Sequence, residues 1–150
     1  MFTDITTIDK GVIMHQVNCQ NVMGAGVAKA LYTKYPQVKE KFHHLATQPD
    51  YNTPTKRFGL VQPVKINDQL VVLNSFSQLH YGRKQGVVYT NYQALLTNLS
   101  KLDAYAKKHN LPAYVPARIG CGLAGGNWNR IKHHRSEEHT SELQSRQCIS

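Results

Sequence analysis

Two glycine-containing loops carry residue types that could bind a phosphate-bearing ligand. The first, residues 18–26, reads Asn-Cys-Gln-Asn-Val-Met-Gly-Ala-Gly and separates an apolar run from a helical pattern. A Gly-x-Gly pair lets backbone approach a ligand closely, and the free N–H groups of the following helix favour phosphate. The Asn18 amide can donate to and accept from a pair of ribose hydroxyls. A tight structural turn would explain the glycines nearly as well.

The second loop, residues 119–126, is richer in glycine and lies between a short apolar run and the start of another helical pattern. Such a loop is costly to order unless it wraps around something. A third polar segment, Asn74-Ser75-Phe76-Ser77-Gln78, also follows an apolar run. Because the carboxyl ends of parallel strands meet at one edge of a sheet, we expect the three segments to form one crevice.

Residues that could act as a base or nucleophile are few. His15 is the imidazole nearest the first loop, but it lies within an apolar run, where a histidine more often fills the core. Cys19 and Cys121 have no neighbouring histidine–acid arrangement, and we interpret both as structural. No metal-ligand spacing is evident, so we expect neither a metal nor a cofactor.

The elements that must position these loops follow from hydrophobic periodicity. The sequence predicts strands over residues 11–17, 59–64, 70–75 and 113–116, and helices over 27–35, 38–46 and 89–109. Strands alternating with helices indicate an α/β fold with a mainly parallel sheet covered on both faces. No run is long enough to cross a bilayer, and three scattered cysteines are typical of a reduced, cytoplasmic protein.

The charge is strongly basic, with 18 Lys and Arg against 9 Asp and Glu and a pI of about 9.6. Such a surface attracts nucleic acid, phosphorylated metabolites or acidic proteins. The lysines are spread along the chain rather than gathered in an arm, which favours a basic domain without a polyanionic partner.

Residues 135–150 differ abruptly from the rest. Their sequence matches the translation of a common sequencing adapter, so we interpret them as a non-native tail. We therefore expect one domain over residues 1–134 that is incomplete at both ends. The loss of packed C-terminal elements would threaten a net stability of about 5–15 kcal/mol.

Residues 17–19, 22–28 and 118–128 together resemble the macro domain family. Within the family they are most similar to small bacterial and phage members that resemble ADP-ribose-1″-phosphate phosphatases. The Asp4-Ile5-Thr6 start resembles the family's first motif, although Thr3 replaces the usual glycine. The resemblance covers residues 3–134 and implies a three-layer α/β/α fold with a mixed, mainly parallel sheet, and a monomer.

The resemblance also implies a small-molecule partner, ADP-ribose or a derivative, and a set of contacts. Asp4 and Ile5 would hold the adenine. The distal ribose would contact Asn18 and the turn of Met23, Gly24, Ala25 and Gly26, and the pyrophosphate would face Val27 and Ala28. The second loop would close over the ligand with Ile119, Gly120, Cys121, Gly122, Leu123 and Ala124. Asn74, Ser75 and Phe76 would line the proximal ribose, where Phe76 could stack on adenine or equally fill the core.

Three functions compete. The favoured one is removal of phosphate from ADP-ribose-1″-phosphate, with Asn18 and Gln20 positioning the phosphate and His15 as a candidate base. The second is release of ADP-ribose from a modified protein or DNA. Some relatives use a lysine after the middle strand and an aspartate after Gly-Cys-Gly-Leu, but Asn74-Ser75-Phe76 and Ala124 stand there. The third is a non-catalytic ADP-ribose reader.

Overall fold

The computed structural model describes residues 5–81, 89–116, 119 and 147–149. A five-stranded sheet with the order β2-β3-β1-β4-β5 forms its centre. The strands are β1 (Gly11–Asn18), β2 (Val61–Asn67), β3 (Leu70–Gln78), β4 (Ala113–Pro116) and β5 (Gln147–Ile149). β2 runs antiparallel to β3, and all other neighbours are parallel. This confirms the mixed, mainly parallel sheet.

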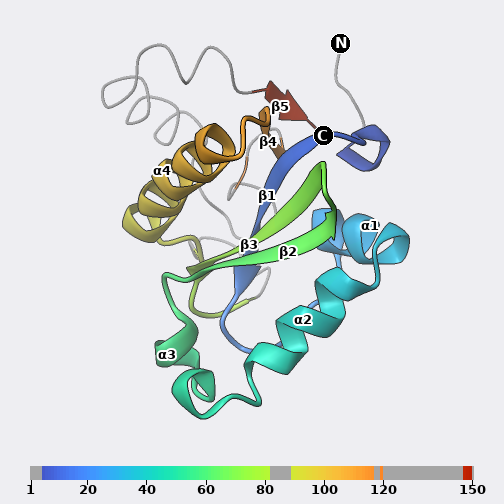
Figure 1. Ribbon diagram of the computed structural model, residues 1–150. Helices are drawn as coiled ribbons and strands as arrows, with labels where there is room; N and C mark the ends of the chain where they lie inside the picture. The colour runs from blue at the N-terminus through green and yellow to red at the C-terminus, as the bar shows by residue number, and fades with distance from the viewer. Residues whose placement is uncertain (1–4, 82–88, 117–118, 120–146, 150) are drawn as a thin grey trace.

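Helices cover both faces of the sheet (Figure 1). They are α1 (Gly26–Lys34), α2 (Gln37–Leu45), α3 (Pro54–Arg57) and α4 (Tyr92–Lys108), with short 3-10 turns η1 (Ile5–Thr7) and η2 (Pro49–Tyr51). α1 and α2 pack on one face and α4 on the other, as the three-layer prediction requires. None of the helices in the described part of the chain is long and apolar enough to cross a membrane.

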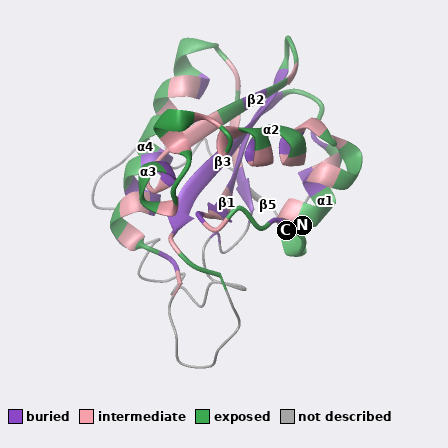
Figure 2. Cartoon of the chain, turned by 90° about the horizontal axis from the view of Figure 1, so that it is seen from below, coloured by how far each residue is buried: buried purple, intermediate pink, exposed green. Residues whose placement is uncertain are grey.

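β1 has a hydrophobic core on each side because successive side chains point to opposite faces. Ile13 and Val17 pack toward α1 and α2, whereas Val12 and Met14 pack toward α4. Figure 2 shows the resulting band of buried residues along β1 and β3, between helices that are exposed on their outer sides. β1 thus has a neighbouring strand at each edge and a hydrophobic core on each face. Its carboxyl end is a well-packed start for the loop that follows.

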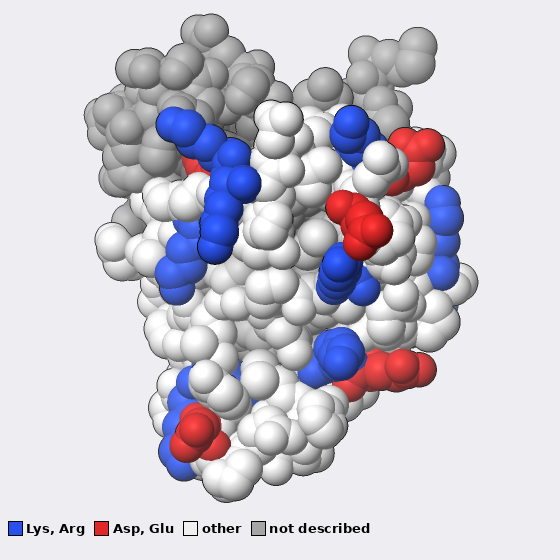
Figure 3. All heavy atoms as spheres, viewed as in Figure 1, with Lys and Arg blue, Asp and Glu red and all other residues white. Residues whose placement is uncertain are grey.

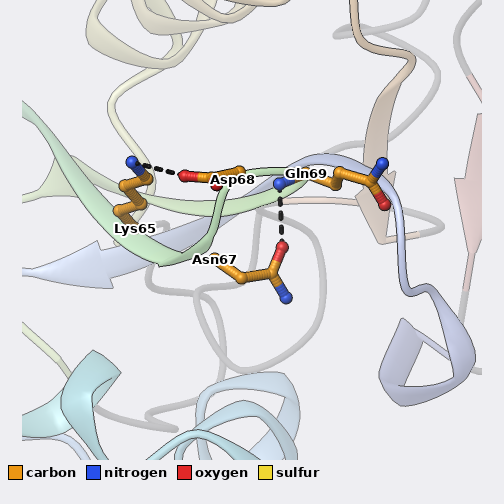
Figure 4. A network of polar contacts seen from close by, with 4 residues as sticks. All are labelled: Lys65, Asn67, Asp68 and Gln69. Atoms are coloured by element: carbon orange, nitrogen blue, oxygen red, sulfur yellow. Dashed lines mark hydrogen bonds and ion pairs between the residues drawn. The ribbon is translucent and has the colours of Figure 1, made fainter.

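The β2–β3 hairpin turns at residues 67–69 (Figure 4). Asn67 Oδ1 accepts a hydrogen bond from the Gln69 N–H at 2.8 Å, and Lys65 Nζ lies 3.0 Å from Asp68 Oδ1. Because both charged side chains are exposed, the ion pair contributes little to stability. The Gln69 carbonyl accepts from the Gly11 N–H at 2.8 Å and joins the turn to the start of β1.

Three elements have bounds that differ from the prediction by more than one residue, and the first is β2, which spans Val61–Asn67 instead of 59–64. β3 continues to Gln78 instead of ending at 75, because its polar residues find partners inside the protein. Asn98 Nδ2 donates to Ser75 Oγ at 2.9 Å, and Ser77 Oγ donates to Gln16 Oε1 at 3.0 Å. α4 begins at Tyr92 rather than at 89, because the Asn91 side chain caps it by accepting from the Ala94 N–H.

The sequence predicts neither α3 nor β5. β5 lies in the segment that we interpret as a non-native tail, and it pairs in parallel with β4, with Tyr114 opposite Gln147. The origin of residues 135–150 stays a prediction.

Candidate functional site

The carboxyl ends of β1 and β3 lie side by side and carry the first loop. Asn18 is paired with Gln78 after a register shift, and the Cys19 N–H donates to the Gln78 carbonyl at 3.0 Å. Gln20 Nε2 donates to the Leu79 carbonyl at 2.8 Å. The loop after β1 is therefore fixed along the end of β3, at the edge of the sheet where open α/β folds bind ligands.

The Asn18 side chain shapes its own loop. Its Oδ1 accepts from the N–H groups of Gln20 and Val22 at 3.0 and 3.4 Å, and its Nδ2 donates to the Val22 carbonyl at 2.8 Å. These bonds occupy Oδ1 and one Nδ2 hydrogen. Among the described residues, the other Asn18 Nδ2 hydrogen, Gln20 Oε1 and the second Gln20 Nε2 hydrogen have no partner, so each amide keeps at least one group for a ligand or water.

The loop ends at an uncapped helix. Gly24 is exposed, and a Cβ added there would meet no atom within 4 Å. Gly26 begins α1 with a positive φ of 62°, and the N-cap residue Ala25 makes no side-chain hydrogen bond to the helix. Met23 is buried and anchors the turn, while Val27 and Ala28 are half-buried. The first N–H groups of α1 thus have no side-chain cap from Ala25 and follow an exposed turn, and free N–H groups at a helix start can bind an anion.

His15 lies inside the sheet, which corrects its candidacy as a base. It is fully buried, and its Nε2 donates to Asn74 Oδ1 at 2.5 Å. Burial lowers the pKa of His15 to about 4, against the opposing effect of the Asn74 bond. His15 is therefore neutral at physiological pH and closed off from substrate, in the structural role that a histidine in an apolar strand usually has.

Asn74, Ser75 and Phe76 are also fully buried, which corrects their expected place on the ligand rim. They lie within β3 because that strand continues to Gln78. The Phe76 ring stacks on Phe42 of α2, with centroids 5.7 Å apart and planes 7° apart. Phe76 therefore fills the core, and β3 ends beyond it at the buried Gln78, which the half-buried Leu79 follows.

Cys19 is a buried free thiol. Burial raises the pKa of Cys19 to about 11, although the nearby Arg57 charge lowers it. The thiol is therefore protonated at neutral pH, and the structural interpretation of Cys19 agrees with this geometry. In the part of the chain that the structure describes, no group of three or more His, Cys, Asp or Glu residues could hold a metal ion.

The remaining predicted contacts divide into two groups. Ile5 and Ile119 are buried in the two cores, at 2% and 4% exposure. Asp4 and the loop residues Gly120, Cys121, Gly122, Leu123 and Ala124 lie outside the described residues.

The sequence interpretation missed Arg57. The residue is 4% exposed, and its guanidinium donates from Nη2 to the Cys19 carbonyl at 2.7 Å. No local pattern marks it, since Lys56-Arg57 reads as an ordinary surface pair.

Charged side chains are unevenly distributed over one face of the protein. Figure 3 shows lysine and arginine side chains adjoining one another at the upper left of the viewed face and, elsewhere on that face, in separate groups beside acidic ones.

Comparison with known proteins identifies the fold. No family model matches the sequence. An uncharacterized 17.5 kDa protein of Enterobacteria phage T4 is 26% identical over 121 residues, which cover 80% of this chain and 74% of the phage protein. A solved protein of unknown function from Bacteroides thetaiotaomicron is 28% identical, with a TM-score of 0.81 over 99% of this chain and 94% of that one.

Two further structures carry a family name. A macrodomain protein from Streptomyces coelicolor is 25% identical, with a TM-score of 0.70 over 94% of this chain and 89% of that one. Thermosipho africanus DarTG, solved in complex with ADP-ribose, is 20% identical, with a TM-score of 0.67 over 93% of this chain and 37% of that one. With the three-layer fold and the loop between β1 and α1 described above, these likenesses show that the chain has the macrodomain fold.

Proposed function

We propose that this chain binds ADP-ribose or a close derivative at the carboxyl edge of β1 and β3. The observation that carries the proposal is the open turn at residues 24–26 in front of the uncapped α1. Backbone N–H groups and the positive end of the helix dipole favour the pyrophosphate there. A similar fold solved with ADP-ribose supports the same ligand class.

The polar groups beside this turn suit a ribose. Asn18 and Gln20 are half-buried and held in place by hydrogen bonds to backbone groups, and each keeps at least one hydrogen-bonding group without a partner among the described residues. Preorganised amides lose little entropy when a ligand hydroxyl binds, so they contribute more affinity than free side chains.

For the reaction, we propose hydrolysis of ADP-ribose-1″-phosphate. Water attacks phosphorus, the bond from phosphorus to the ribose O1″ breaks, and that oxygen leaves with a proton. Asn18 and Gln20 would position the phosphate and the water. Because neither amide titrates, the proton from water would pass to a phosphate oxygen of the substrate.

A specific observation favours a second candidate, a non-catalytic reader. His15 is buried and Cys19 is protonated, so neither group supplies a base at the described part of the rim. The reader and the phosphatase share the same binding site and differ only in turnover.

Calorimetric titration of ADP-ribose into the full chain tests binding. The Cβ that Gly24→Val adds to the exposed turn has no atom within 4 Å, so the fold should persist. We expect affinity to fall at least about tenfold, or ~1.4 kcal/mol. Ala104→Val, on the exposed side of α4, is the matched control and should leave affinity unchanged. Absence of ADP-ribose binding by the folded wild type would refute the ligand assignment.

Phosphate release from ADP-ribose-1″-phosphate then separates the two candidates. Turnover that falls in Asn18→Ala and Gln20→Ala supports the phosphatase, and tight binding without turnover supports the reader. Parallel assays with an ADP-ribosylated protein and an ADP-ribosylated DNA oligonucleotide test the ADP-ribosyl hydrolase alternative.

A further inference from the structure

Arg57 is a buried cation whose observed partners are backbone carbonyls. It ends α3, a four-residue helix that Thr53 caps by accepting from the Lys56 N–H. Nη1 donates to the Tyr51 carbonyl at 2.9 Å and Nη2 to the Cys19 carbonyl at 2.7 Å. Among the described residues no carboxylate pairs with the guanidinium, and the buried Nε has no partner.

Stability alone explains this arrangement poorly. Burying a charge without a counter-charge costs free energy, and a neutral side chain of similar volume is often no less stable. Two hydrogen bonds to carbonyls offset only part of that cost, since Nε stays unpaired. An apolar side chain could not replace the hydrogen bond that the guanidinium donates to the first loop, 38 residues earlier in the chain.

This hydrogen bond holds the first loop at Cys19, between the two amide residues of the proposed site. The Cys19 N–H is held by the Gln78 carbonyl, and the Cys19 carbonyl is held by Arg57. Because both its N–H and its carbonyl are hydrogen-bonded, the backbone of Cys19 is restrained on either side. The orientation of both amide side chains at the proposed site depends on that backbone.

We propose that Arg57 is a positioning residue for ligand binding, which fixes the first loop through the Cys19 carbonyl. The inference rests on the proposed ADP-ribose site. The planar guanidinium fork reaches two different carbonyls, one in η2 and one in the loop, and so joins the segment before α3 to the ligand edge of the sheet.

The test uses Arg57→Lys in the full chain. Lysine keeps the charge but lacks the fork, so we expect ADP-ribose affinity to fall about tenfold, the effect of losing one hydrogen bond to a charged group. Lys56→Gln, the exposed neighbour, is the surface control. Leu102→Ala, buried against the opposite face of the sheet, is the control for general destabilisation and should retain affinity in its folded fraction.

Amide hydrogen exchange gives a readout that does not need the ligand. Exchange of the Cys19 and Gln20 N–H groups should accelerate in Arg57→Lys beyond any change in global stability, and should not do so in Leu102→Ala. Unchanged exchange at this loop, or wild-type affinity in a variant whose loop is loosened, would overturn the proposal. If the wild type itself does not bind ADP-ribose, the proposed function fails while the exchange result still decides whether Arg57 fixes the loop.

A measurement on the unaltered protein covers the case in which the variants do not fold. Ligand binding should slow exchange of the Arg57 guanidinium protons seen by nitrogen-15 NMR, because a bound ligand suppresses opening of the loop. Guanidinium exchange that is indifferent to saturating ADP-ribose would contradict the proposal.

Discussion

Replacement of Gly11 by alanine should destabilise the protein strongly. Gly11 begins β1 with a φ of +147°, a region that residues with a side chain rarely adopt. An added Cβ would lie 2.7 Å from Tyr114 Cε2 and 2.9 Å from the Pro112 carbonyl oxygen. The tyrosine ring can shift, but the Pro112 oxygen is backbone and also accepts from the Val12 N–H at 2.8 Å.

The magnitude follows from two separate costs. The disfavoured backbone conformation costs about 1–3 kcal/mol, and overpacking costs about 1–3 kcal/mol. Their sum, about 2–6 kcal/mol, is a large part of a typical net stability of about 5–15 kcal/mol.

Urea unfolding followed by far-ultraviolet circular dichroism measures this loss. The midpoint should fall without a change in slope, since the same surface is exposed on unfolding. Gly24→Ala is the matched control, because an added Cβ there meets nothing within 4 Å, and its stability should lie within about 0.5 kcal/mol of the wild type. A Gly11→Ala protein as stable as that control would refute the reasoning. Adding Tyr114→Leu to Gly11→Ala should recover only the part of the lost stability that comes from the contact with the tyrosine ring.

Three further outcomes follow from buried groups. The pKa of His15 is 6.5 in the unfolded chain and about 4 in the folded protein. Burial of the neutral imidazole therefore contributes about 3 kcal/mol of stability above pH 6.5, and this contribution is lost as the pH falls to 4. Denaturation at both pH values should show a smaller difference in unfolding free energy for His15→Gln than for the wild type. Phe76→Leu should cost about 1–3 kcal/mol by removing the stacking on Phe42, yet leave ADP-ribose affinity intact, and a large loss of affinity would return Phe76 to the ligand site. Cys19 should resist iodoacetamide in the folded protein and react in urea, as peptide mapping would show, because it is buried with a pKa of about 11.

Hydrophobic periodicity predicted most of the fold. The runs at 11–17 and 113–116 became β1 and β4, and the helical patterns at 27–35 and 38–46 became α1 and α2 with shifts of one residue at most. These elements are predictable because each has an apolar side facing a core, and this side appears in the sequence as a regular spacing of apolar residues. The boundary between the two helices was also predictable, because Pro36 separates them.

Polar burial was harder to predict. Asn74, Ser75 and Ser77 look like loop residues in sequence, yet partners from β1, β2 and α4 let them continue β3 through the interior. Arg57 shows the same limit, because its role depends on a carbonyl far away in the chain. The first loop was recognised from its local glycines and amides, whereas contacts supplied by distant strands had no local signal.

The buried polar side chains also bear on how the strands find their alignment. His15, Asn74 and Gln62 lie abreast on three neighbouring strands, and the row continues from Gln62 Nε2 to the Lys41 carbonyl of α2. A slip of β3 by two residues would keep every apolar side chain on its proper face, so hydrophobic alternation alone does not penalise it. The same slip would set Val72 or Phe76 beside His15 and leave His15 and Asn74 buried without each other. The row of polar side chains therefore distinguishes the native strand register from registers shifted by two residues. A chain with apolar residues at these three positions would be expected to populate sheets with shifted registers.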